Sequence, residues 1–160
     1  MSRARQRQTS IERVDARSRA WRGLLEVASF VTQRIDEDLR DQVAIDIQTY
    51  DAMLHTKEAG EAGIRMTDLA DRVLLSKAGL TALVDRLEDR GLLARQPGRE
   101  DRRVKRIVLT PAGWDLFRQA AAVHDATVEQ WFRQHLDETT AQPTAETLAR
   151  IHQAHLAAKR

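Results

Sequence analysis

The sequence contains no cysteine among its 160 residues. This absence excludes thiol-based sensing and cysteine-ligated metal, and it agrees with a reducing compartment. No apolar run approaches the roughly 18 residues that a membrane-spanning helix needs. The first ten residues, MSRARQRQTS, lack the apolar segment of a secretory signal. We therefore expect a cytoplasmic protein that does not contact the membrane.

Motifs of catalytic and cofactor sites are also missing. The sequence has no GxGxxG, no P-loop lysine motif, no HExxH and no CxxC. His152 and His155 are spaced i, i+3, but such a lone pair is far more often surface or core than a zinc site. We expect no enzyme activity, no cofactor and no metal.

Charge is nearly balanced overall, with 26 basic and 24 acidic residues and a net charge of +2. The 42% of hydrophobic residues allow a core, the 4% of aromatics suit a helical protein, and the length suits one domain with extensions. Basic residues are concentrated at the N-terminus. The first 22 residues contain only two acidic residues, Glu12 and Asp15, but seven arginines, at positions 3, 5, 7, 13, 17, 19 and 22. Residues 1–14 are predicted to be a basic arm, either touching DNA or serving as a solubilising tail.

The segment from Ser76 to Leu92 predicts an amphipathic helix. Ser76 can cap its start and Gly91 can end it in a left-handed conformation. One face carries the apolar residues Leu80, Leu83, Val84 and Leu87, spaced by three and four. The opposite face, whose first turn is small or hydrogen-bonding, carries Lys77, Ala78, Thr81, Ala82, Asp85 and Arg86. A partner's surface could approach this face closely.

A second helical pattern precedes this helix. It begins with Thr67 as the expected N-cap and continues to Leu74, so that Leu75 alone separates the two helices. Two short helices with a tight joint indicate a helix-turn-helix, although two packed helices of an all-α core fit the same residues.

A β-hairpin with a basic tip is predicted next. A strand over 92–95 leads to the turn dipeptide Pro97-Gly98, and a second strand runs over 104–109. Residues 64–66 could add a third strand. Six basic residues lie in the hairpin: Arg95, Arg99, Arg102, Arg103, Lys105 and Arg106. A solvated hairpin is one interpretation, but directly after a helix-turn-helix this excess favours nucleic-acid contact through counterion release.

Long helices are predicted on both sides of this unit. The first runs over about 15–40 and the second over 43–57. Thr110-Pro111 can cap and start another helix to about Leu136, and a last helix follows Pro143. Trp21 lies on the apolar stripe of the first helix, where packing is favoured over ligand contact. Because the terminal helices carry surplus apolar surface, they favour a dimer interface.

Together these motifs resemble the MarR family of bacterial winged-helix regulators, over roughly residues 17 to 158. Asp101-Arg102-Arg103 followed by LTPAG (residues 109–113) is similar to the family's wing signature, and Leu80–Leu93 is similar to its recognition helix. Gly79 departs from strong helix formers at a cost of up to about 1 kcal/mol, which close approach to a base pair would explain.

The resemblance implies a fold and a set of site residues. The fold would be mainly α with a small β-hairpin wing: a winged helix-turn-helix lobe over 43–109, with dimerisation helices over 15–42 and 110–160. The partners would be double-stranded DNA, a second copy of the chain, and a small aromatic anionic or phenolic effector. DNA contacts would come from Ser76, Lys77, Ala78, Gly79, Thr81, Ala82, Arg86, Arg99, Asp101, Arg102, Arg103 and Lys105. Arg103 resembles the arginine that enters the minor groove, and Asp101 the carboxylate that orients nearby arginines. Trp21 and His124 are the candidate effector residues.

We therefore interpret the sequence as a regulator that binds palindromic operator DNA as a homodimer, acting as a ligand-responsive repressor. The rival from another class is a winged-helix module for protein–protein contact, whose basic wing is merely solvated.

Overall fold

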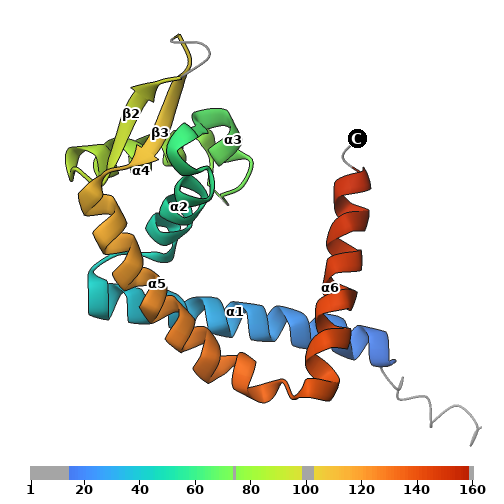
Figure 1. The fold of residues 1–160 in the computed structure, drawn as a ribbon. Helices are drawn as coiled ribbons and strands as arrows, with labels where there is room; N and C mark the ends of the chain where they lie inside the picture. The colour runs from blue at the N-terminus through green and yellow to red at the C-terminus, as the bar shows by residue number, and fades with distance from the viewer. Residues whose placement is uncertain (1–14, 74, 99–102, 159–160) are drawn as a thin grey trace, which may run out of the picture.

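The computed structural model describes residues 15–73, 75–98 and 103–158. A small lobe of short helices and a sheet sits at one end of two long crossing helices, and a final helix stands apart from the lobe (Figure 1). This arrangement confirms the predicted fold class, mainly α with a β-hairpin wing.

The first helix, α1, spans Ala16–Val43, and the shorter helix that follows it, α2, spans Ile47–Glu58. Asp15 caps α1 by accepting a hydrogen bond from the Ser18 amide at 2.8 Å. The predicted boundary between the two helices was wrong by several residues. α1 continues to Val43 and ends at Ala44, which adopts a left-handed φ of 56°. α2 starts only after Asp46, whose carboxylate accepts from the Thr49 amide at 2.7 Å.

The lobe contains a three-stranded antiparallel sheet, formed by β1 (Ile64–Arg65), β2 (Leu93–Pro97) and β3 (Lys105–Leu109). The strand order is β1-β3-β2, with Ile64 opposite Ile107 and Leu93 opposite Leu109. The predicted third strand at 64–66 is therefore confirmed for its first two residues. A 3₁₀ turn, Gly60–Ala62, connects α2 to β1.

The helix-turn-helix is formed by α3 (Met66–Ala70) and α4 (Lys77–Asp89). Two predictions about it were wrong. Thr67 is not the N-cap: Arg65 occupies that position because β1 leads directly into α3, and the Thr67 hydroxyl donates to Asp68 instead. The joint is also longer than one residue, because α3 ends at Ala70 and the segment 71–76 precedes α4.

One apolar cluster holds the lobe together. The predicted face of α4 is buried, with Leu80, Leu83, Val84 and Leu87 each at most 3% exposed. It packs with residues of α2, α3 and the sheet, including Ala52, Leu69, Leu93 and Ile107. Burial of this face fixes the opposite face of α4 towards solvent.

The helix α5 (Pro111–Trp131) packs along α1 and forms a second cluster. Thr110 caps it as predicted, accepting from the Gly113 amide at 3.0 Å. The Phe30 and Trp131 rings meet edge-on at 5.3 Å, and the Thr127 hydroxyl donates to Asp38 at 2.6 Å. α5 ends at Trp131, five residues before the predicted end, and a 3₁₀ turn, Arg133–His135, follows.

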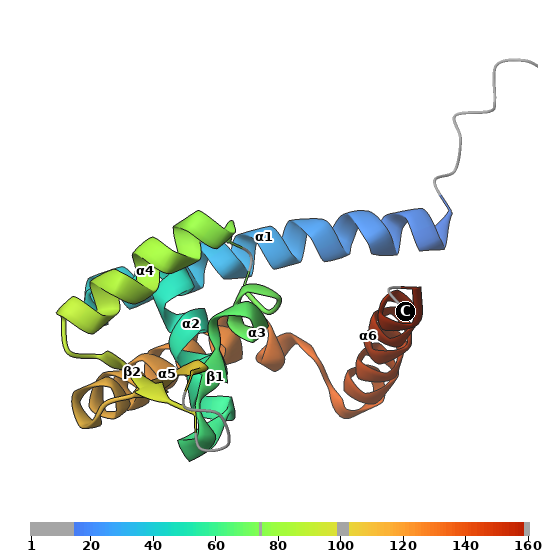
Figure 2. The same cartoon turned by 90° about the horizontal axis from the view of Figure 1, so that it is seen from above.

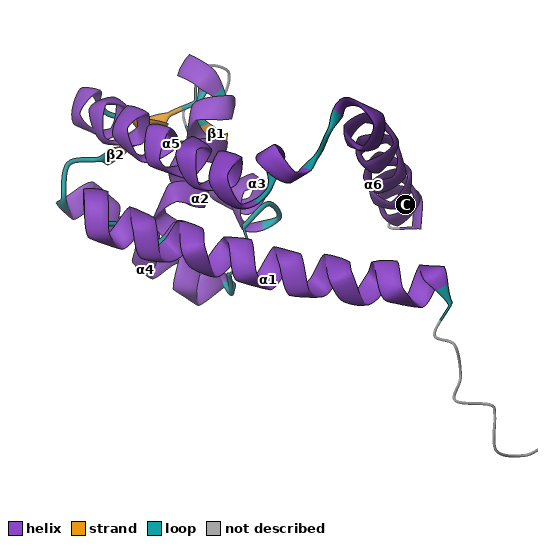
Figure 3. Ribbon diagram, turned by 90° about the horizontal axis from the view of Figure 1, so that it is seen from below, coloured by secondary structure: helices purple, strands orange, loops and turns teal. Residues whose placement is uncertain are grey.

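The last helix, α6, spans Glu138–Ala158 and includes Pro143 within it. The prediction that it begins after Pro143 was wrong, because Asp137 accepts from the amides of Thr139 and Thr140 at 2.9 Å and starts the helix earlier. Proline is tolerated near a helix start, although at Pro143 it removes one backbone donor. None of the described side chains of α6 is buried, and it lies away from the lobe in two further views (Figures 2 and 3).

Candidate nucleic-acid interface

The exposed face of α4 is the centre of the candidate interface. Lys77, Ala78, Thr81, Ala82 and Arg86 are all exposed, and Gly79 is partly exposed. The Thr81 hydroxyl is turned back to the Lys77 carbonyl at 3.0 Å. The first two turns thus present a low surface, small enough for the helix backbone to approach the floor of a groove.

The start of α4 is held by a side-chain cap. The Ser76 hydroxyl accepts from the Gly79 amide at 3.1 Å, as the sequence predicts. A Cβ at position 79 would lie 3.2 Å from this same oxygen, which is tighter than most real contacts. The glycine therefore leaves room for the cap, in addition to lowering the surface of the helix.

The wing is formed by β2, β3 and the turn between them. The Gly98 amide donates to the Val104 carbonyl at 2.8 Å and closes the hairpin. Arg103 and Lys105 are exposed, and their contact with DNA stays a prediction. Arg99, Asp101 and Arg102 lie outside the described residues, as does the basic arm 1–14.

Arg95 is one of the six basic residues of the hairpin, but it does not contribute a free positive charge to the wing. Its guanidinium pairs with Glu88 and Asp85 of α4, and its amide donates to Glu88 at 3.1 Å. These hydrogen bonds, with Asp85 as the largest contributor, raise the pKa of Arg95 further above its usual value. The pairing fastens β2 to the recognition helix.

Arg106 also has a structural role. Its guanidinium donates to the Gly63 carbonyl at 3.1 Å and so links β3 to the chain entering β1. Two of the six basic residues counted in the hairpin, neither of which is among the predicted DNA contacts, are therefore engaged within the lobe. The acidic pair Asp85 and Glu88, spaced i, i+3 on α4 and facing β2, was the signal in the sequence that pointed to Arg95.

Gly113, the glycine of the LTPAG motif, is required by packing. A Cβ there would collide with the Leu92 carbonyl oxygen, and would lie 3.2 Å from a methyl of Leu109. The Thr110 amide donates to that same carbonyl at 3.1 Å. The motif therefore joins the sheet to α5 at close range.

The two candidate effector residues lie far apart on one chain. Trp21 is 61% exposed near the start of α1. His124 stacks on the Tyr50 ring with centroids 4.8 Å apart, and its Nδ1 is buried without a hydrogen-bond partner among the described residues. Thr127 lies about one turn after His124 on α5, and its hydroxyl donates to Asp38 of α1. Asp38 therefore shows which part of α1 lies beside this region of α5. Trp21 is 17 residues earlier, about 25 Å along the helix at 1.5 Å per residue.

The pKa values of two groups near His124, the Asp51 carboxyl and the Tyr50 hydroxyl, are raised. Burial raises the pKa of Asp51, and the nearby His55 and His124 oppose this only in part. Burial also raises the pKa of Tyr50, assisted by the negative charges of Asp125 and Asp51. This cluster lies between α2 and α5, and among the described residues no group of three or more acidic or histidine side chains could hold a metal ion.

An open cleft of about 620 Å³ runs between α1 and the start of α2. Its lining includes Leu25, Ala28, Ser29, Thr32, Ile47 and Gln48. Asp36 joins its two walls by accepting from the Ile47 amide at 2.9 Å, and its hydrogen bond with Arg40 is the main cause of its lowered pKa. Neither Trp21 nor His124 lines this cleft.

No helix in the described ranges is long and apolar enough to cross a membrane. A comparison with curated protein sequences gives no match.

Comparison with family models and solved structures gives consistent matches. The model of the MarR family matches residues 45–104, which is most of the lobe. AbsC, a MarR family transcriptional regulator from Streptomyces coelicolor, is 29% identical, with 87% of this chain and 93% of that chain covered and a TM-score of 0.76. CouR from Rhodococcus jostii RHA1, solved with p-coumaroyl-CoA bound, is 27% identical, with 80% of this chain and 87% of that chain covered and a TM-score of 0.71.

Sco3205 from Streptomyces coelicolor, a MarR family transcriptional regulator solved in complex with DNA, covers 88% of this chain and 92% of its own with a TM-score of 0.76. At 23% identity it supports the fold alone. The family model, the relatives that are more than a quarter identical, the strand order and the capped recognition helix agree with one another. The lobe over residues 45–104 therefore matches the MarR family of winged helix-turn-helix proteins, and the fold of the chain is similar to that of solved members of this family.

Proposed function

We propose that this protein is a transcriptional regulator that binds palindromic double-stranded DNA as a homodimer and represses transcription until a small ligand binds. The observation that carries the DNA-binding role is the exposed face of α4, which is low, polar and held by a side-chain cap beside the wing. A helix of this kind fits the major groove, where base edges are distinguishable. Residues 43–109 would form the DNA-binding lobe.

The proposed dimer rests on the exposed apolar side chains of the terminal helices. On α1 these are Trp21, Leu24, Leu25, Val27 and Phe30, and on α6 they are Leu148, Ile151 and Leu156, all at least 37% exposed. A helix of 21 residues with no buried side chain has little reason to be stable alone, because tertiary packing supplies most helical stability. A second copy that pairs residues 15–42 and 110–160 with their equivalents would cover both sets.

The wing and the arm 1–14 would hold the flanks of the operator. Arg103 is the first described residue after the hairpin tip. From this position a guanidinium can enter a narrow, A·T-rich minor groove. Lys105 lies on β3, where an ammonium group can meet a phosphate.

The proposed effector is a small aromatic carboxylate or phenol. The cleft between α1 and α2 supports this proposal because it combines apolar side chains with Arg40, and because it opens beside the apolar face of α1. A ligand bound there would change the angle between the lobe and the dimer helices. Trp21 does not line the cleft, but it lies about one helical turn before Leu25, which does.

DNA fragments selected from a random pool by the purified protein test the main proposal. We expect an inverted repeat with half-sites about one helical turn apart, roughly 34–36 Å. Inserting five base pairs between the half-sites should abolish specific binding, since it turns one half-site to the opposite face. Selection of no consensus, or equal affinity for the expanded site, would argue against the proposal.

Fluorescence anisotropy on the selected operator tests the wing. Arg103→Ala should weaken binding by about 1–3 kcal/mol and reduce the preference for A·T flanks, whereas Lys105→Ala should weaken binding evenly across sequences. If both variants bind every operator as the wild type does, the wing has no part in recognition.

A further inference from the structure

A second, polar cleft lies on the other side of the junction between α1 and α2. It has a volume of about 340 Å³ and is lined by Arg40, Ala44, Ile45, Asp46, Thr49, Arg86 and Arg90. Its size falls within the roughly 300–1,000 Å³ typical of small-molecule sites, but its lining is polar and rich in arginine. The chemistry of this lining therefore favours an anion over an apolar ligand.

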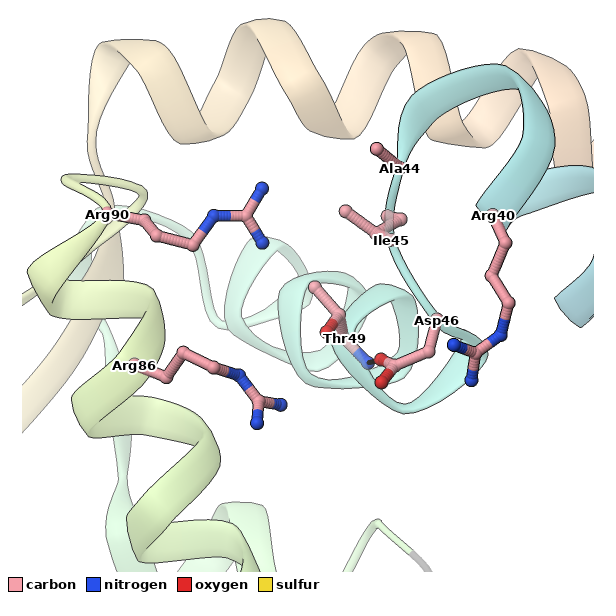
Figure 4. A pocket seen from close by; sticks show the side chains of 7 residues that line it. All are labelled: Arg40, Ala44, Ile45, Asp46, Thr49, Arg86 and Arg90. Carbon is pink, nitrogen blue, oxygen red and sulfur yellow. Dashed lines mark hydrogen bonds between the residues drawn. The ribbon is translucent and has the colours of Figure 1, made fainter.

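The arginines reach the cleft from two different elements. Arg86 and Arg90 extend side by side from α4 towards the first turn of α2, and Arg40 reaches the same turn from the end of α1 (Figure 4). Arg40 is held in place, because its Nε donates to Asp36 at 2.8 Å. Guanidinium groups on opposing walls can contact one ligand from two sides.

Two of these guanidinium groups are not neutralised by the protein. Within the described ranges, neither Arg86 nor Arg90 has a side-chain hydrogen bond or ion pair, although both are exposed. They are four residues apart on one helix face, a spacing at which like charges repel each other. The acidic residue of the lining, Asp46, accepts from the Thr49 amide at 2.7 Å as the cap of α2.

The first turn of α2 contributes mainly its positive electrostatic potential to the cleft, rather than hydrogen-bond donors. Two of its first three amides are already engaged, since Ile47 donates to Asp36 and Thr49 donates to Asp46. The positive end of the helix dipole still favours negative charge in the cleft. Direct contacts with a ligand would come from the guanidinium forks, whose geometry matches the oxygens of phosphate in bidentate pairs.

We propose that this cleft binds a phosphate group, presented either by a small phosphorylated ligand or by the DNA backbone. Two free guanidinium groups match the charge of a phosphate dianion. Because Arg86 also belongs to α4, an occupied cleft would change the electrostatics of the recognition helix from its C-terminal end. Binding of a small phosphate does not depend on the proposed function, whereas the DNA source rests on it.

The first arm of the test uses no DNA. Pyrophosphate is titrated into the full chain by calorimetry at constant ionic strength, with sodium chloride as the control titrant. The variants are Arg90→Gln and, as a matched control, Arg118→Gln, which removes an exposed arginine of α5 that does not line the cleft. A small-ligand source predicts saturable binding that Arg90→Gln weakens about tenfold, as expected for loss of one charge-assisted contact, and that Arg118→Gln leaves unchanged.

The second arm measures affinity for the selected operator at several salt concentrations. A backbone source predicts that Arg90→Gln weakens binding evenly across operators and lowers the salt slope by about one unit, with no effect of Arg118→Gln. Either pattern supports the phosphate site and identifies its source. The proposal is overturned if Arg90→Gln matches the wild type in both arms. Wild-type protein that binds pyrophosphate but no DNA would refute the proposed function alone.

Discussion

The contact between Arg95 and α4 sets the angle between the wing and the recognition helix, and replacing Arg95 by methionine removes it while keeping most of the side-chain volume. The change deletes the ion pairs with Asp85 and Glu88 but retains the amide hydrogen bond to Glu88. It also leaves two carboxylates of α4 without their cation. We expect a loss of stability and a loss of DNA affinity.

The size of the stability loss follows from the exposure of the partners. A hydrogen bond between charged groups contributes about 1.5–3 kcal/mol when well shielded, and an exposed pair about 0.2–1 kcal/mol. Arg95 is 28% exposed, but Asp85 and Glu88 are 54% and 38% exposed, so both pairs are partly screened. We therefore expect the free energy of unfolding to fall by about 1–2 kcal/mol, which lowers the melting temperature by about 2–8 °C for a chain of this length.

Urea unfolding followed by circular dichroism measures this loss, and Arg118→Met is its control. Arg118 also pairs with an acidic residue, Asp115, but the two side chains are 67% and 64% exposed. The control should therefore lose less than about 0.5 kcal/mol. Equal unfolding midpoints for Arg95→Met and the wild type would refute the role of Arg95 as a fastener.

Operator binding by Arg95→Met gives an independent readout. The freed Asp85 carboxylate is 54% exposed and lies about one helical turn after Thr81 and Ala82, so it should repel phosphates. Arg95→Met combined with Asp85→Asn should recover part of the lost affinity. If the double variant binds DNA no better than the single one, the released charge is not the cause.

Three further changes test other parts of the structure. Ser76→Ala removes the cap of α4 and should cost about 1 kcal/mol in thermal unfolding, together with weaker operator binding. Gly113→Ala places a methyl group against the Leu92 carbonyl and should destabilise the protein by about 1–3 kcal/mol or more. Its control, Gly23→Ala, has open space around it on α1 and should stabilise the protein by up to about 1 kcal/mol. Equal melting temperatures for the two variants would contradict the packing argument. For Asp51, burial raises the folded pKa above the unfolded value near 3.8, so the folded state binds more protons and stability falls as the pH rises from 3.8 through the folded pKa. Asp51→Asn should remove that part of the pH dependence and raise the melting temperature at pH 7, and an unchanged pH profile would count against it.

Local patterns in the sequence determined the recognition helix. The period of Leu80, Leu83, Val84 and Leu87 specifies which face of α4 is buried, and Ser76 and Gly91 define its two ends. Caps and periodic faces act over three or four residues, so one sequence is sufficient to predict them. The start of α5 at Thr110-Pro111 and the strand at residue 64 were predictable for the same reason.

Helix ends without such signals depended on more distant contacts. α1 continues past Arg40 because Asp36 accepts hydrogen bonds both from Arg40 and from the Ile47 amide at the start of α2, rather than because of a local motif. α6 begins before Pro143 because Asp137 satisfies two amides. A proline suggests a boundary, but a cap can place the boundary upstream of it.

The roles of individual charges were decided only by the tertiary structure. Arg95, Arg103 and Arg106 are alike in the sequence, yet Arg95 meets two acids of α4 and Arg106 meets the Gly63 carbonyl. Likewise, Arg86 and Arg90 face a cleft whose other wall is formed by residues some 40 positions earlier. The sequence determines which side chains carry charge and which face of each helix is apolar. Which charges are neutralised depends on the packing of segments distant in the chain, because a salt bridge requires its two partners within about 4 Å of each other in space.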